Sequence, residues 1–388
     1  MIIGGILPWG CAEGDVREGA DGGPRSAGGA RSFARSLALE DTAVTSANVS
    51  LGDVNGDGHL DVVLVRGRHW PLDNLLRLGD GQGGFAPAVP LGAPADRSYS
   101  GVLVDLDGDG DLDVVVSNDD PDPKRVLLND GSGRFALGST FGRGEWATRH
   151  VRVADLNGDG RPDAVLANRY GSETGPSFVC FGTDDGGFED GCEPVTQGSA
   201  TTIAPADIDG DGDVDLVVPH RDQGQGFVYL NDGRGAFPER RPFGPANAAI
   251  RSAEAADLDG DGVQDLVVID ERTGPAVFWG AADGTWPRVT PLVAPHPTEA
   301  RPYALYLADV DEDGRTDVLV GYVEARPVVF FNDGPEVLTP VAFGDAEGAV
   351  YGFAVGDLDE DGRLDIALAR SGARNMVYFG AVEGAEGR

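Results

Sequence analysis

A nine-residue acidic pattern recurs along the chain and constrains its fold more than any other feature. One copy, residues 155–163, reads DLNGDGRPD. The seven copies begin at Asp53, Asp105, Asp155, Asp207, Asp257, Asp309 and Asp357, with spacings of 52, 50, 52, 50, 52 and 48 residues. Because this near-constant spacing extends through most of the 388 residues, it predicts one array of similar repeats rather than several unrelated domains.

The residue types in the pattern indicate a calcium loop. In every copy the first, fifth and ninth positions are Asp, the third is Asp or Asn, and the sixth is Gly. Side-chain oxygens at alternate positions of a tight turn can converge on one hard cation if a glycine permits the bend. Position seven varies freely, as expected where only the backbone carbonyl binds. Magnesium fits less well, since it takes few protein ligands in a strict octahedron.

No glutamate stands at position twelve, so the ninth-position Asp is expected to complete the ligand shell. Position seven is expected to contribute its carbonyl, and the His59 ring is expected to be a bystander. The predicted ligands of up to seven calcium ions are Asp53, Asn55, Asp57, His59, Asp61; Asp105, Asp107, Asp109, Asp111, Asp113; Asp155, Asn157, Asp159, Arg161, Asp163; Asp207, Asp209, Asp211, Asp213, Asp215; Asp257, Asp259, Asp261, Val263, Asp265; Asp309, Asp311, Asp313, Arg315, Asp317; and Asp357, Asp359, Asp361, Arg363, Asp365.

The charge of the chain restricts its partners. Thirty basic and 65 acidic side chains give a net charge of −35, and seven calcium ions would bring it to −35 + 14 = −21. Without metal, the clustered carboxylates should repel one another and loosen the structure. Since nucleic-acid binding requires a basic surface, nucleic acid is not an expected partner.

Short apolar runs surround each loop and predict strands. Runs such as VRVA and DAVLAN flank the loop at 155–163, and turns such as NDGSGRF follow a third run and lead into a fourth. No stretch shows a sustained helical period. Four short strands per repeat, repeated seven times, predict an all-β, seven-bladed β-propeller with four-stranded blades.

The two ends of the array are expected to close the ring. The last repeat stops at AVEGAEGR before a fourth strand, whereas AGGARSFARSLALE near the start resembles a turn followed by a fourth strand. Residues 31–39 are therefore expected to pair with residues 375–380, completing the last blade and removing a free edge.

These loops, with junction phrases such as AFGDAEGAV and PFGPANA, resemble FG-GAP or VCBS repeats over about residues 31–388. These are the calcium-loop propeller repeats of integrin α-subunit heads and of many bacterial secreted proteins. The resemblance implies the propeller fold and calcium. It says little about the ligand, because propellers carry many functions.

The cysteines suggest an oxidising compartment. Cys180 and Cys192 flank the turn TDDGG and are expected to form a disulfide across a hairpin; two unpaired buried thiols are the alternative. Residues 1–30 are expected to be a signal or lipoprotein-like remnant and a flexible tether, and 31–388 the propeller. Cys11 follows MIIGGILPWG and is a candidate lipid anchor, although that stretch lacks a basic start. No transmembrane segment is expected.

A second periodic position predicts a ligand site at one mouth of the central channel. Six residues before each first Asp, at the expected start of the innermost strands, stand Ala47, Tyr99, Arg149, Thr201, Arg251, Tyr303 and Tyr351. A basic residue also occurs in each connection from second to third strand. Tyr and Arg supply much of the energy at recognition surfaces.

We expect Tyr99, Arg149, Arg251, Tyr303 and Tyr351 to bind an anionic or carbohydrate ligand, or an acidic segment of a partner protein. In the alternative, the tyrosines fill gaps between blades and the arginines pair with acids such as Asp119, Asp270 or Glu271.

No catalytic motif was found, so the chain is not expected to be an enzyme. The interpretation is a monomeric, calcium-stabilised binding module, secreted or at the cell surface, of adhesion or lectin type. An enzyme acting on polysaccharide and a scaffold without a small ligand are the alternatives.

Overall fold

A computed structural model describes residues 31–92, 94–171, 175–222, 224–296 and 300–381. Over these residues the chain forms 28 β-strands and no helix, so none of the described segments is a helix that could cross a membrane. The expected tether and Cys11 lie outside the described residues.

Four sheets each contain four consecutive antiparallel strands. They are β6 (Ser98–Val104), β7 (Asp113–Asn118), β8 (Lys124–Asn129) and β9 (Phe135–Phe141); β10 (Thr148–Ala154), β11 (Asp163–Asn168), β12 (Phe178–Cys180) and β13 (Glu193–Pro194); β14 (Ala204–Ala206), β15 (Asp215–Val218), β16 (Gly226–Leu230) and β17 (Glu239–Phe243); and β18 (Ile250–Ala256), β19 (Asp265–Asp270), β20 (Gly274–Trp279) and β21 (Arg288–Pro291).

The remaining twelve strands form one larger sheet. They are β1 (Ser32–Ala38), β2 (Val44–Gly52), β3 (Asp61–Arg66), β4 (Leu75–Arg77), β5 (Val89–Pro90), β22 (Arg301–Ala308), β23 (Asp317–Val323), β24 (Val328–Gly334), β25 (Val337–Ala342), β26 (Ala349–Gly356), β27 (Asp365–Ala373) and β28 (Met376–Ala381). Here too, strands pair with their sequence neighbours. Short pairings join one group of such strands to the next: Val323 of β23 pairs with Ala349 of β26, and Val44 of β2 pairs with Ala373 of β27.

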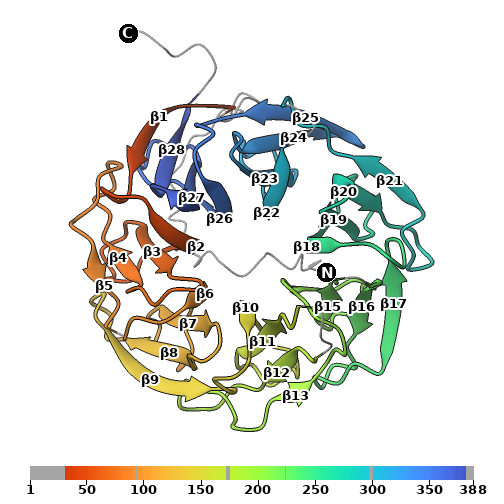
Figure 1. Ribbon diagram of the computed structural model, residues 1–388, viewed down its shortest axis with the longest axis horizontal. Helices are drawn as coiled ribbons and strands as arrows, with labels where there is room; N and C mark the ends of the chain where they lie inside the picture. Colours follow the sequence, from red (N-terminus) through yellow and green to blue (C-terminus); the bar gives the residue numbers. More distant parts are fainter. Residues whose placement is uncertain (1–30, 93, 172–174, 223, 297–299, 382–388) are drawn as a thin grey trace, which may run out of the picture.

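The sheets stand around a central axis (Figure 1). Strands such as β2, β6, β10, β18, β22 and β26 lie nearest the axis, and β5, β9, β13, β17, β21, β25 and β1 lie toward the rim. The architecture is an all-β, propeller-like ring. Some fourth strands are shorter than expected: β5 and β13 each have two residues and end at Pro90 and Pro194, which cannot donate to a ladder.

The N-terminal strand pairs with the C-terminal strand, which confirms the expected closure. β1 runs antiparallel to β28 from Ser32 opposite Ala381 to Ala38 opposite Met376. The Phe33 ring is 6% exposed and lies 5.1 Å from that of Phe343. These contacts cover the edge of β28 that would otherwise be free.

The core explains why the second strands carry consecutive apolar residues. β7 reads DVVVSN, and all six of its residues are buried. Neighbouring sheets cover both of its faces: Val115 belongs to a cluster with Val151 and Leu166 of the next sheet, and Val114 and Val116 to a cluster with Val63 and Val65 of the preceding one. A strand covered on both faces has no need of alternating polar residues.

Candidate metal loops and the axial mouth

The acidic loops join first and second strands and turn through left-handed backbone at two positions. The sixth-position glycines have φ from 80° to 96°, and a Cβ on Gly110 or Gly314 would meet nothing within 4 Å. Glycine is therefore required there by the positive φ, and not by a lack of space for a Cβ atom.

The fourth position, which is not part of the ligand pattern, also has positive φ. Five copies have glycine there, from Gly56 at 72° to Gly260 at 79°, but Glu312 and Glu360 adopt 55° and 53°. A non-glycine residue in this region costs about 1–2 kcal/mol. The five glycines were the signal that could have identified this second bend.

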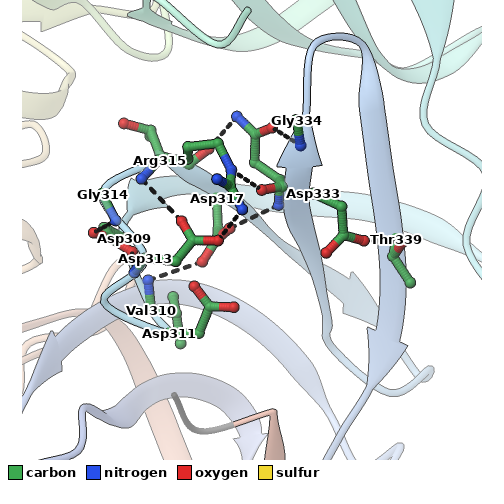
Figure 2. Close-up of polar contacts among 12 residues, drawn as sticks. Asp309, Val310, Asp311, Asp313, Gly314, Arg315, Asp317, Asp333, Gly334 and Thr339 are labelled. Atoms are coloured by element: carbon green, nitrogen blue, oxygen red, sulfur yellow. Dashed lines mark hydrogen bonds and ion pairs between the residues drawn. The ribbon is translucent and has the colours of Figure 1, made fainter. Parts of the chain in front are cut away.

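The first Asp of each loop organises the turn. In the loop drawn in Figure 2, Asp309 Oδ1 accepts from the Asp313 N–H at 3.0 Å, and its Oδ2 accepts from the Gly314 N–H at 2.8 Å. The same bond from the sixth-position N–H to the first Asp occurs in the other copies, for example from Gly58 to Asp53 at 2.8 Å. These hydrogen bonds therefore hold the loop around the carboxylate without the help of an ion.

The ninth Asp clamps the loop to the third strand of its sheet. Asp317 Oδ2 accepts from the Val310 N–H and its Oδ1 from the Asn332 N–H, both at 2.8 Å (Figure 2). Every copy repeats this pair of bonds. The carboxylates are Asp61, Asp113, Asp163, Asp215, Asp265, Asp317 and Asp365, each at most 1% exposed.

This structural role was not foreseen, because the third-strand donor lies 15 to 19 residues beyond the Asp. A carboxylate oxygen has two lone pairs, so accepting one N–H leaves a site for a cation.

Burial disfavours the charged form of these carboxylates. It raises the pKa of Asp61, Asp113, Asp163, Asp215 and Asp265 to about 6, and that of Asp317 and Asp365 to about 7, even though the two backbone N–H groups oppose the shift. Repulsion from the other loop carboxylates adds to the effect of burial. A bound cation would supply the missing positive charge.

Five loops bring three carboxylates together, with one oxygen of each within 4.8 Å of the others. The triads are Asp105, Asp107 and Asp113; Asp207, Asp209 and Asp215; Asp257, Asp259 and Asp265; Asp309, Asp311 and Asp317; and Asp357, Asp359 and Asp361. Such a set of hard oxygen donors fits a divalent cation. In the other two loops, Asn55 and Asn157 offer amide oxygens, which accept the N–H of Asp57 and Asp159 at 3.0 and 2.9 Å.

Basic side chains at the seventh position contact acidic residues of the loops. Arg161, Arg315 and Arg363 contact the fifth-position carboxylates of their own loops, and His59 contacts Glu360 of another loop. Arginines from outside the motif also reach third-position carboxylates: Arg31 lies 2.6 Å from Asp311 and Arg35 lies 3.0 Å from Asp359.

Cys180 and Cys192 form a disulfide. Cys180 ends β12 and Cys192 precedes β13, so the bond ties the last two strands of that sheet together beside the ladder of β12 and β13.

The structure brings all seven residues of the second periodic position to one axial cavity of about 190 Å³. Arg149 lies over the Tyr99 ring at 4.3 Å from its centroid, and Arg251 over the Tyr303 ring at 3.2 Å. The Tyr351 hydroxyl donates to that of Tyr303 at 2.9 Å. We call this ring of residues, from Ala47 to Tyr351, the axial mouth.

The arginines of the axial mouth also have acidic partners. Arg149 lies 2.6 Å from Asp119 and Arg251 lies 3.3 Å from Glu271, whereas Asp270 accepts the backbone N–H of Arg272. The place of these arginines at the cavity thus fits contact with a ligand, and their ion pairs fit the alternative of local pairing with acids.

Most of the basic residues in the second-to-third connections hold the fold. Lys124 is fully buried and donates to the carbonyls of Arg143 and Trp146, and Arg370 lies 2.5 Å from Asp345. Arg169 is paired with Asp222 at 2.9 Å. In these three connections the basic residue supports neighbouring loops.

Known proteins resemble this chain in repeat sequence and in fold. An FG-GAP-like repeat model matches residues 53–116, 105–166, 207–268, 257–320 and 309–368. No curated protein matches the sequence. Among solved structures, BBS1N in complex with ARL6DN is similar in a mercury-soaked crystal, with a TM-score of 0.60 and 12% identity over 90% of this chain and 97% of that chain.

A lead-soaked crystal of the same complex also has a TM-score of 0.60 at 12% identity, covering 92% of this chain and 98% of that chain. The Dos1 propeller has a TM-score of 0.55 at 13% identity, covering 86% of this chain and 78% of that chain. At these identities the structures show a shared fold alone. Because the repeat model covers well over half of the sequence, the chain belongs to the FG-GAP-like repeat family.

Proposed function

We propose that this chain is a calcium-stabilised binding module of the cell surface or the extracellular space, built as a seven-bladed propeller of four-stranded blades. Sets of four strands pair in sequence order, and the acidic motif recurs seven times at near-equal spacing. The Cys180–Cys192 disulfide favours an oxidising compartment.

Calcium is the cation that the loops suit best. Each triad offers carboxylate oxygens only, and the family resemblance points the same way. The neighbouring negative charges and the raised pKa of the ninth Asp make the empty loops unfavourable at neutral pH, so an ion is expected to stabilise the ring.

The observation that carries a binding function is the axial mouth. Six innermost strands contribute one residue each and Thr201 precedes a seventh, and these residues include three tyrosines and two arginines at a single cavity. Tyr and Arg combine stacking with hydrogen bonding, and such residues dominate binding energy at recognition sites. The expected partner is a glycan or a protein segment, bound by a monomer at the face opposite the calcium loops.

The alternatives are an enzyme acting on polysaccharide and a scaffold. An enzyme needs an acid or base free to act near the cavity. The two acids closest to Arg149 and Arg251, Asp119 and Glu271, are each held in an ion pair.

An array of neutral glycans, acidic glycans and acidic peptides tests the binding function. The calcium-saturated protein should bind at least one class, and an Arg149→Ala/Arg251→Ala double variant should lose that binding. Binding unchanged in the double variant would place the site elsewhere. New reducing ends or unsaturated products from a bound polysaccharide would instead support the enzyme.

A further inference from the structure

Arg68 differs from the other arginines around the axial mouth. Arg149 is paired with Asp119, and Arg251 and Arg221 share Glu271, at 3.3 and 2.6 Å. Within the described part of the chain, Arg68 has no carboxylate within 4.0 Å. Its Nη1 donates to Ser371 Oγ at 3.0 Å, and its buried Nε, like that of Arg149, has no hydrogen-bond partner.

The backbone holds Arg68 in place above the mouth. Arg68 has φ of 54°, a left-handed conformation that is costly for a residue with a side chain. Its N–H donates to the Ser98 carbonyl at 3.0 Å. The preceding Gly67 has φ of 113°, and a Cβ there would lie 2.5 Å from the Trp70 carbonyl oxygen and 2.6 Å from that of Asp96.

The Arg68 guanidinium lies beside two tyrosines of the cavity lining. It is 3.9 Å from the centroid of the Tyr351 ring and 5.8 Å from that of Tyr99. These residues stand on either side of Ala47 in the order of the inner strands, so Arg68 occupies the sector where the smallest member of the ring leaves room.

The mouth is positively charged on a strongly acidic protein. Four guanidinium groups lie around the mouth, those of Arg68, Arg149, Arg221 and Arg251, and the ion pairs of the last three involve two carboxylates, those of Asp119 and Glu271. Burial lowers the pKa of His69, and Arg149 and Arg68 lower it further, so its ring is neutral at neutral pH. The excess charge favours an anionic ligand, and Arg68 is the cation without an acid of its own.

Deeper in the cavity the charges cancel. Arg152 Nη2 donates to Glu254 Oε1 at 2.8 Å, and both residues line the cavity three positions beyond Arg149 and Arg251 along their strands. The net positive charge therefore remains at the mouth.

Besides Arg149, three residues of the cavity lining carry buried polar atoms without hydrogen-bond partners. The atoms are Thr201 Oγ1, Thr202 Oγ1 and His150 Nδ1. His150 hydrogen-bonds to the backbone of Ile203, and burial holds its pKa well below the ordinary value, so the neutral ring presents Nδ1 as an acceptor. A carboxylate offers acceptors only and cannot satisfy Nδ1. A ligand hydroxyl both donates and accepts.

We propose that the axial mouth binds an acidic saccharide, whose carboxylate pairs with Arg68 and whose hydroxyls bond to Thr201, Thr202 and His150. This inference rests on the proposed function and names its ligand class. The cavity of about 190 Å³ is large enough for several waters, which the hydroxyls of one sugar unit would replace.

The test compares end-labelled trigalacturonate with the same trisaccharide after methyl esterification of its carboxyl groups. The calcium-saturated full chain should bind the acid at least about tenfold more tightly than the ester, the range of a hydrogen bond to a charged group. Arg68→Gln should abolish this preference, and Arg68→Lys should retain most of it. Thr201→Val should weaken binding of both probes alike.

Arg272→Gln is the matched control. Arg272 is an exposed arginine of another second-to-third connection, and it contacts the Asn247 carbonyl away from the cavity lining. Its variant should bind both probes like the original chain. The melting curve of each variant shows whether it is folded.

Three results would overturn the inference: equal affinity for acid and ester, an acid preference that survives Arg68→Gln, or no binding of either probe. Arg68-dependent capture of a labelled acidic peptide without saccharide binding would also overturn it, yet would leave the proposed binding function standing. Loss of all array binding would remove both.

Discussion

Substitution of a ninth-position Asp separates the structural role of the loop from its proposed metal-binding role. Asp113 is 1% exposed and accepts from the N–H of Leu106 at 3.0 Å and from that of Asn129 at 2.8 Å. In Asp113→Asn, one acceptor oxygen becomes an NH2 group that faces a backbone donor. One charge-assisted hydrogen bond is lost and a buried N–H is left without a partner.

Each of these losses costs about 1–3 kcal/mol. Burial raises the pKa of Asp113 to about 6, so the neutral amide regains part of the cost of burying a charge. We expect a net loss of about 2 kcal/mol in the free energy of unfolding, present with and without calcium because the backbone donors need no ion.

Asp107→Asn in the same loop is the matched comparison. Asp107 belongs to the same triad, is exposed, and makes a single long contact with the Asp109 N–H at 3.3 Å. In a chelator this variant should match or slightly exceed the original chain in stability, since it removes a repelling charge. In calcium it should lose the stabilisation that ion binding provides.

Urea unfolding followed by tryptophan fluorescence, in calcium and in chelator, measures all four cases. The reasoning is refuted if Asp113→Asn has no effect in chelator, or if Asp107→Asn loses as much stability there as Asp113→Asn.

Three further perturbations have defined outcomes. In calcium-free buffer the seven ninth-position carboxyls have pKa values raised to about 6 or 7, so the folded chain binds more protons than the unfolded one. Its free energy of unfolding should therefore fall as pH rises from about 4 to about 7, and excess calcium should reverse this slope. A calcium-free slope of opposite sign in urea titrations would contradict the assignment. Phe33→Ala should cost about 3 kcal/mol by emptying the site beside Phe343 and should increase aggregation measured by light scattering, whereas unaltered stability would argue against closure by β1. Cys180→Ala/Cys192→Ala should lower stability by about 2–3 kcal/mol in urea unfolding, with no further loss on adding reductant, because the bond closes a short loop; equal stability of variant and original under oxidising conditions would contradict this.

The fold and the acidic loops were predictable because their determinants are local. Nine consecutive residues set the bend and the oxygens of each loop, as Asp309 and Gly314 illustrate, and the periodic spacing shows how often the unit recurs. Pairing of β1 with β28 followed from a missing strand at one end and a surplus strand at the other.

Other features depend on contacts between distant segments. The clamp from Asp317 to Asn332 requires the third strand to lie beside the loop, and nothing in the motif itself indicates that donor. The distinctive position of Arg68 follows from what its neighbours pair with, since Arg149 and Arg251 have acidic partners that sequence spacing does not reveal. The seven mouth residues, by contrast, were identified by their constant offset from the first Asp.

The stoichiometry of bound calcium tests the central claim most directly. The purified chain, dialysed to equilibrium against saturating calcium and analysed by mass spectrometry of the elements, should carry seven calcium ions, one for each acidic loop. Three or fewer ions per chain under these conditions would contradict the account, because most of the loops would then fold and persist without the cation.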